Sequence, residues 1–159
     1  MARYQQQRYP IGSVSCGTMR EEDLIPDFVW ELNNQLRTQR VSRTQRKEHS
    51  TLVREIESRM ESDEYYESEE ANWDLEALFD ALDCYAGPGF YFGSHPGDGA
   101  DYGYWLSESF EEDFEGLRVS DLSEVPAKYR GEVLVVNDHG NMTLYVKTSR
   151  TMREVWAVV

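Results

Sequence analysis

The fold is decided between Asn72 and Phe92, where the chain reads NWDLEALFDALDCYAGPGFYF. The first part of this stretch repeats apolar residues at helical spacing. The residues on the expected apolar side are Trp73, Leu75, Leu78, Phe79, Leu82 and Tyr85. Gly87-Pro88-Gly89 is a strong signal for the end of a helix. Beyond Gly89 the period changes to two, which is typical of strands. The sequence therefore predicts helices before this point and strands after it.

Two more helices are predicted on the N-terminal side. The first carries an apolar stripe over 24–36, and Thr18 with Glu21 forms a capping box at its start. Pro26 lies inside the stripe, so either a short first turn ends near Leu24 and a separate helix opens with Pro26, or one helix kinks there, and we favour the former. The second helix is predicted from a Ser42 cap to about 60, and its first half contains no apolar residue.

Strands are expected on both sides of the helices. The segments with strand periodicity are Ile11–Cys16, Phe90–Phe92, Tyr102–Leu106, Glu132–Val136, Met142–Val146 and Glu154–Val159. The run Asn137-Asp-His-Gly-Asn141 between two of them predicts a hairpin turn. We therefore predict an α+β fold, with N-terminal helices packed on one face of a C-terminal antiparallel sheet of four or five strands. We expect one domain over 1–159, with a helical part at about 18–86 and a β-meander at about 89–159.

Charge is distributed unevenly along the 159 residues, whose formal net charge is −14. Between Glu61 and Glu124 there are nineteen acidic residues and a single base, Arg118. Between Arg37 and Met60, in contrast, seven bases stand against three acids. A net charge of this sign disfavours direct binding to nucleic acid or to an anionic membrane, and it suits a basic protein surface as partner.

The N-terminal segment 1–15 has no apolar run that resembles a signal peptide. No window approaches the roughly 18 apolar residues that a membrane span requires. Cys16 and Cys84 have no metal-binding or redox spacing, so we expect two reduced thiols. Together these observations predict a soluble, cytoplasmic protein that has no membrane partner.

The acidic tract supplies the first candidate site. Its carboxylates can compete for the Lys and Arg grooves of nucleases or polymerases, as nucleic acid does. Tyr65 and Tyr66 are predicted to anchor such an interface. The candidate partner-binding residues are Asp63, Glu64, Tyr65, Tyr66, Glu67, Glu69, Glu70, Glu111, Glu112 and Asp113. The alternative interpretation is a solvated face that only keeps the protein in solution.

A second candidate site is the loop that contains His95, Asp98 and Asp101, to which His139 can be added if the two hairpins are neighbours. An imidazole with carboxylates can bind a divalent cation or transfer protons. Pro-Gly-Asp-Gly is also ordinary turn chemistry, and we favour that interpretation, with no metal or other cofactor. His49 is expected to be solvated, because charged residues surround it in the sequence.

Three blocks of the chain carry a resemblance: GTMREEDLIPDF from Gly17, PGFYFGSHPGDGADYGYW from Pro88 and NDHGNMTLY from Asn137. In them the chain resembles a family of small acidic proteins of phages and other mobile elements. The resemblance implies a context, because phage accessory proteins of this size often block host defence, as anti-CRISPR and anti-restriction proteins do. It transfers no catalytic residue.

Three hypotheses about function follow. The first is a non-enzymatic inhibitor in the host cytoplasm that binds the basic groove of a nuclease or CRISPR effector. The second is a small metal-dependent hydrolase that uses the His95 loop. The third is a self-associating scaffold, such as a homodimer, in which the basic helix of one copy pairs with the acidic tract of another.

Overall fold

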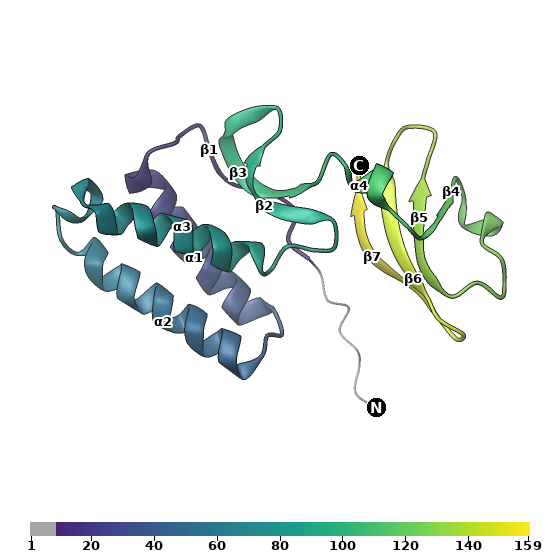
Figure 1. Cartoon of the computed structure of the whole chain (residues 1–159), viewed down its shortest axis with the longest axis horizontal. Coiled ribbons are helices and arrows are strands. Elements are labelled where there is room, and N and C mark those ends of the chain that lie inside the picture. Colours follow the sequence, from purple (N-terminus) through teal and green to yellow (C-terminus); the bar gives the residue numbers. More distant parts are fainter. Residues whose placement is uncertain (1–8) are drawn as a thin grey trace. The chain divides into compact units, whose positions relative to one another are not determined.

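The computed structural model describes residues 9–159, which group into two compact units (Figure 1). The helical unit spans Pro10–Ser107 and the β unit spans Glu108–Val159. The expectation of a single domain stays a prediction.

The helical unit has three layers. Its elements are β1 (Gly12–Cys16), α1 (Glu21–Thr38), α2 (Arg43–Met60), the 3-10 turn η1 (Tyr65–Glu67), α3 (Glu69–Asp83), β2 (Phe90–His95) and β3 (Asp98–Leu106). The strands form an antiparallel sheet in the order β1-β3-β2. Helices α1 and α3 pack against each other and against this sheet, and α2 packs on α1 (Figure 1). Because α2 reverses the direction of α1 and α3 reverses it again, α1 and α3 run parallel, and Asn72 donates a hydrogen bond to Glu21 at their common N-terminal end.

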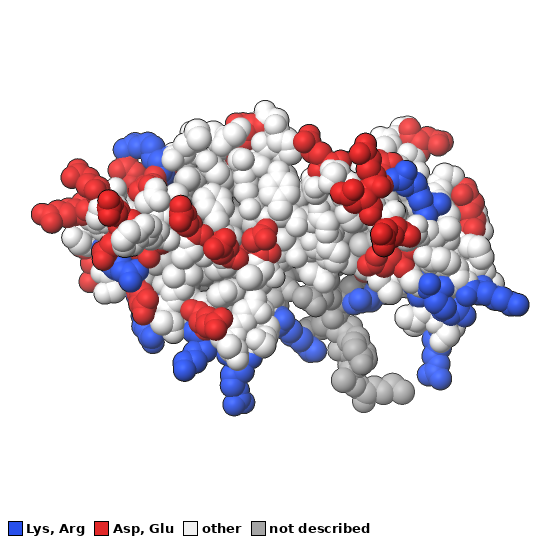
Figure 2. Space-filling model, in the orientation of Figure 1, with Lys and Arg blue, Asp and Glu red and all other residues white. Residues whose placement is uncertain are grey.

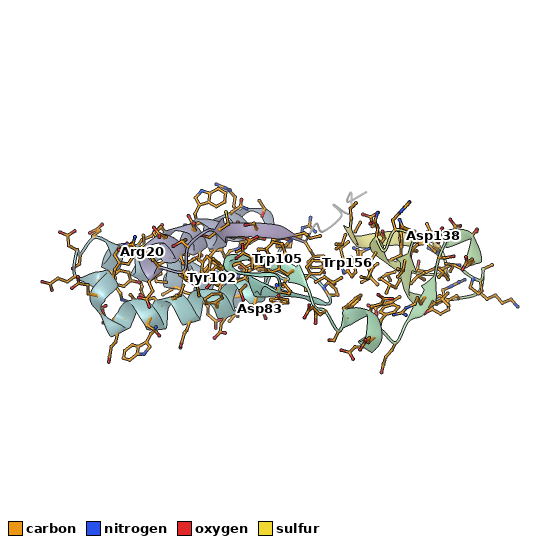
Figure 3. All side chains as sticks on the ribbon, turned by 90° about the horizontal axis from the view of Figure 1, so that it is seen from above. Arg20, Asp83, Tyr102, Trp105, Asp138 and Trp156 are labelled. Atoms are coloured by element: carbon orange, nitrogen blue, oxygen red, sulfur yellow. The ribbon has the colours of Figure 1, made fainter. Side chains whose placement is uncertain are left out.

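Phe28 is the centre of the aromatic core of this unit. Its side chain is fully buried, and its ring meets Phe79 and Phe92 edge-on at centroid distances of 5.1 and 5.0 Å. Tyr102 of β3 completes the cluster at 6.0 Å from Phe28 and lies among the side chains between sheet and helices (Figure 3). These contacts join α1, α3, β2 and β3, so the first hairpin belongs to the helical unit and not to the C-terminal meander.

Two local predictions for α1 are wrong. The helix is continuous from Glu21 to Thr38 with Pro26 inside it. Leu24, Ile25 and Phe28 are all buried against the core, and this burial outweighs the cost of the missing proline amide. The capping box does not form either, because the Thr18 hydroxyl donates to Asp23 and Arg20 is the N-cap residue.

The β unit is a four-stranded sheet in the order β4-β5-β6-β7. Its elements are α4 (Phe110–Asp113), β4 (Leu117–Val119), η2 (Leu122–Glu124), β5 (Gly131–Val136), β6 (Met142–Lys147) and β7 (Met152–Val158). The predicted hairpin is the β5–β6 pair, and Gly140 supplies the positive φ of 81° that its turn needs. Strand β4 adds to β5 in parallel, which the sequence did not indicate. Trp156 of the edge strand β7 is buried, and Phe110 packs edge-on against it at a centroid distance of 5.3 Å.

The α+β class, with helices first and a C-terminal sheet after them, is confirmed. The strands form two sheets instead of one, because β1 pairs with β3 and places a three-stranded sheet within the helical unit. Cys16 and Cys84 are both exposed and free. Among the described residues, no helix is both long and apolar enough to span a membrane.

Replacing Phe28 by Ala is expected to lower the free energy of unfolding by about 3–5 kcal/mol, because it removes a fully buried aromatic ring and leaves a cavity. Chemical denaturation followed by far-UV circular dichroism measures the change. Trp30→Ala is the matched control on the same helix. That indole is 66% exposed, and its loss is expected to cost about 0.5 kcal/mol. Equal losses in the two variants would contradict the assignment of Phe28 as the core residue.

Candidate functional site

A buried polar network fixes the turn between α2 and α3. Asp74 is only 7% exposed and accepts hydrogen bonds from Arg59 Nη1, at 2.8 Å to Oδ1 and 2.9 Å to Oδ2. The Tyr65 hydroxyl donates to Oδ2 of the same carboxylate at 2.8 Å. Burial, and then the bond to Asp74, raises the pKa of Tyr65 well above its ordinary value. The network joins the last turn of α2, η1 and α3.

The prediction that Tyr65 anchors an interface is therefore wrong. Its side chain is 4% exposed, and its hydroxyl is already used inside the unit. Tyr66 packs edge-on against it at a centroid distance of 5.0 Å and is half-buried, so it offers only part of its ring. The carboxylates around them point outward. We define the acidic tip as the exposed residues Asp63, Glu64, Glu67 and Glu70.

The outer side of α3 carries a second set of exposed residues, which we call the α3 stripe. Its members are Glu69, Trp73, Glu76 and Asp80. They follow the spacing i, i+4, i+7, i+11, so they lie along one face of the helix. Trp73 is 63% exposed, although its apolar character predicted a place in the core. The sequence did contain a signal for this exposure, because the residues next to Trp73 on its face of the helix are acids.

The carboxylates of the acidic tip and the α3 stripe form no ion pair within the described helical unit, although the charge of Glu70, after the bond to Asp74, helps to raise the pKa of the Arg59 guanidinium. Within the described part of the helical unit, the ion pairs are Arg20 with Glu22 and Arg59 with Glu55 and Asp74. None of these involves the tip or the stripe. Figure 2 shows acidic atoms gathered over the end of the unit at η1 and along α3, with basic atoms over the N-terminal part of α2.

The remaining predicted acids, Glu111, Glu112 and Asp113, belong to the β unit. Glu112 and Asp113 of α4 are exposed. Glu111 is half-buried and pairs with Arg118 at 3.4 Å, and its main-chain oxygen also accepts a bond from that guanidinium. The α4 segment is therefore a smaller and partly neutralised acidic patch.

The loop of the second candidate site is a tight hairpin turn. His95 and Asp98 are paired across Pro96-Gly97, and His95 Nδ1 accepts the Gly97 amide at 2.9 Å. Asp98 accepts the Ala100 amide at 3.0 Å. Asp101 accepts the Ser13 hydroxyl at 2.5 Å. The bonds of His95 and Asp98 are those of a hairpin turn, whereas the bond to Asp101 joins β3 to β1.

The ring of His95 also packs edge-on against Trp105 at 4.7 Å between centroids. His139 is exposed at the β5–β6 turn of the other unit, where its amide donates to Asn137. No group of three or more His, Cys, Asp or Glu side chains in residues 9–159 is placed to hold a metal ion. The geometry therefore gives the hydrolase hypothesis no support.

The expectation that His49 is solvated is wrong. The imidazole is 8% exposed, and its Nδ1 lies 2.8 Å from the Tyr85 hydroxyl. Burial lowers the pKa of His49, and the neighbouring Glu48 opposes that shift. Burial also raises the pKa of Tyr85 to about 12. The apolar stripe of α2 at Val53 and Ile56 continues at helical spacing to position 49, and this signal was available in the sequence.

A second buried polar group lies between α1 and β3. Glu31 and Gln35 are 6% and 3% exposed, and the Gln35 amide donates to Glu31 at 2.6 Å. The Tyr104 hydroxyl, 1% exposed, makes no hydrogen bond of good geometry. Burial, and then the nearby Glu31 carboxylate, raises the pKa of Tyr104. These side chains are enclosed in the core and offer no surface to a partner.

No protein-family model, curated protein or solved structure matches this chain. The resemblance to acidic mobile-element proteins stays a prediction.

Tyr65→Phe is expected to lower the free energy of unfolding by about 1.5–3 kcal/mol, because it removes a buried hydrogen bond to an ionised carboxylate. Tyr66→Phe, at the adjacent and half-buried ring, is expected to change it by less than about 0.5 kcal/mol. Urea denaturation of both variants measures the difference. A Tyr65→Phe protein as stable as Tyr66→Phe would rule out the network as the device that fixes the turn.

The buried His49 predicts a dependence of stability on pH. Above the ordinary pKa of 6.5, His49 is neutral in both states and contributes no pH dependence. As the pH falls below 6.5, the unfolded chain binds a proton that the folded chain resists. The free energy of unfolding should therefore decrease, by up to about 1.4 kcal/mol per pH unit, until the lowered folded-state pKa is reached.

Denaturation curves at intervals between about pH 7 and 5 test this dependence, since most carboxylates stay ionised over that range. His49→Gln keeps a polar side chain that can bond Tyr85 and removes the titration. Its stability should be flatter over the same range. Parallel pH profiles for the two proteins would contradict the assignment.

Proposed function

We propose that this chain is a non-enzymatic binding protein whose acidic tip and α3 stripe dock on a basic protein surface. The observation that carries the proposal is the exposed Trp73 among carboxylates that form no ion pair in the described helical unit. Exposed tryptophan is a frequent hot spot in interfaces, and surrounding charges select the partner and speed its association.

Helix stability does not account for the stripe. Acids in the first turn of a helix are favourable because they face the positive end of its dipole, and this covers Glu69 and Glu70. Glu76 and Asp80 lie beyond that turn, and α3 has no base in its last turn. The acids alone fit a solvated face, and the exposed indole placed among them favours an interface instead.

The proposal takes the partner to be a nucleic-acid-handling protein of the host, such as a nuclease or CRISPR effector. A groove that binds phosphates presents Lys and Arg side chains at close spacing, and a line of carboxylates on a rigid helix can occupy it. The resemblance to acidic mobile-element proteins points to the same class of partner. Inhibition then follows from competition with nucleic acid and needs no chemistry.

The test is binding of purified nucleases and CRISPR effectors to the immobilised protein at rising salt. We expect the dissociation constant to increase by at least about tenfold between about 50 and about 500 mM salt, since screening weakens exposed charge pairs. Trp73→Ala should weaken binding by about 30-fold or more. The combination Glu69→Lys, Glu76→Lys and Asp80→Lys should abolish it.

Two control variants separate the stripe from general effects. Trp30→Ala removes an indole of similar exposure, 66%, from α1. The second control makes the same change in net charge as the triple α3-stripe variant, but on exposed residues of the β unit: Glu108→Lys, Glu132→Lys and Asp138→Lys. Both should bind like the unmodified protein. If either control weakens binding as much as its stripe counterpart, or if salt has no effect, the proposed surface is wrong.

A further inference from the structure

The exposed side of α2 carries a set of residues with the same spacing as the α3 stripe. We call it the α2 stripe: Arg43, Lys47, Ser50 and Arg54. Its members are exposed and follow i, i+4, i+7, i+11. None of its three bases has a carboxylate partner among the ion pairs of the described residues. Arg46, by contrast, is used internally, donating to the carbonyl oxygens of Leu36 and Gln39.

The two stripes complement each other in antiparallel order. The three bases are separated by four and then seven residues along α2, and the three acids have the same separations when α3 is followed backwards. One antiparallel alignment therefore gives three opposite-charge pairs: Arg43 with Asp80, Lys47 with Glu76 and Arg54 with Glu69. The same register places Trp73 opposite Ser50, the one small side chain of the α2 stripe. Three opposite-charge pairs and a seat for the indole therefore come from a single alignment. We infer that the α2 stripe binds the α3 stripe of a second copy of this chain.

The complementary register cannot form within one copy. There, Arg59 bonds Asp74 and His49 bonds Tyr85, which fixes α2 and α3 at another level. With the helices fixed in this way, Arg54, and not Arg43, lies at the same height along the helices as Asp80, a difference of about eleven residues, or about 16 Å at 1.5 Å per residue. The stripes also face outward, so the contact has to be made between molecules.

The same offset decides the kind of assembly. In a two-fold dimer, antiparallel packing of α2 on α3 of the other copy requires an axis parallel to the helices. Rotation about that axis moves no residue along the helices, so Arg54 and not Arg43 would still lie at the height of Asp80. The contact is therefore heterologous, and each pair leaves one α2 stripe and one α3 stripe open. Association should continue beyond the dimer as protein concentration increases. The net charge of −14 opposes it at long range, but screening limits that repulsion to about 10 Å at 0.1 M salt.

This contact uses the same α3 stripe as the proposed function, and a basic partner would compete with it. The α2 stripe is not part of the proposed docking surface. Reversing only the α2 stripe should therefore abolish self-association and leave binding to a basic partner intact. The two proposals can fail independently.

The test is analytical ultracentrifugation under reducing conditions, with two charge-reversed variants of the full chain. One carries Arg43→Glu, Lys47→Glu and Arg54→Glu, and the other carries Glu69→Lys, Glu76→Lys and Asp80→Lys. At about 50 mM salt the unmodified protein should increase in average mass beyond a dimer as concentration rises, and return to monomer at about 500 mM salt. Each variant alone should stay monomeric.

An equimolar mixture of the two variants should associate again, since it restores an acidic stripe opposite a basic one. Reversing three charges shifts the net charge of −14 by six, to −20 in one variant and −8 in the other, so overall attraction cannot explain a recovery. A control variant reverses three exposed bases outside the stripe and also has a net charge of −20: Arg40→Glu, Lys128→Glu and Arg150→Glu. It should associate like the unmodified protein.

Circular dichroism melting shows whether each variant is folded. A monomeric unmodified protein at low salt and high concentration would overturn the inference. So would a folded mixture of variants that does not associate, or association that α2 reversal leaves unchanged. A mass that stops at the dimer would overturn the heterologous register.

Discussion

The burial of the Asp74 carboxylate is the constraint on which the candidate surface depends. A charge this far from water is costly unless it is paired and hydrogen-bonded, and Arg59 and Tyr65 supply both conditions. Since neighbouring residues on a helix point about 100° apart, turning Asp74 inward turns Trp73 outward. The usual preference is thereby reversed at two adjacent positions, with an acid inside and an indole in solvent. The α3 stripe exists because of this rotation.

The features that follow from local periodicity could be predicted from the sequence. Helix α2 with its Ser42 cap, the end of α3 before Gly87, and the β5–β6 hairpin were all correct, because each is encoded by a few neighbouring residues. The acidic character of the candidate surface was also visible, since charge is a property of composition.

The features that were missed depend on partners distant in the sequence. Trp73 looks like a core residue until the partners of Asp74 are known, and Tyr65 looks like a surface anchor until its bond to that carboxylate is known. His49 is buried because Tyr85 lies 36 positions further along the chain to receive it. Pro26 is tolerated because the residues on both sides of it are buried against other elements. In each case tertiary packing outweighed a sound local rule.

The layout of charge on the helices indicates which residues are placed for helix stability and which are not. Helix α1 follows the dipole rule, with Glu21, Glu22 and Asp23 in its first turn and Arg37 in its last. Helix α2 begins with no acid, and instead has Arg43, Arg46 and Lys47 near its positive end.

Helix α3 ends without a base and has acids, Asp80 and Asp83, near its negative end. Each such placement costs about 0.3–1 kcal/mol when exposed. Arg46 offsets its cost by bonding the last carbonyl groups of α1, and Asp83 offsets its own by accepting the Phe92 amide. No side-chain hydrogen bond offsets the cost in the described residues for three other charges, Arg43, Lys47 and Asp80. All three belong to the two stripes. The charges that helix stability does not explain are thus the ones that intermolecular contact would use.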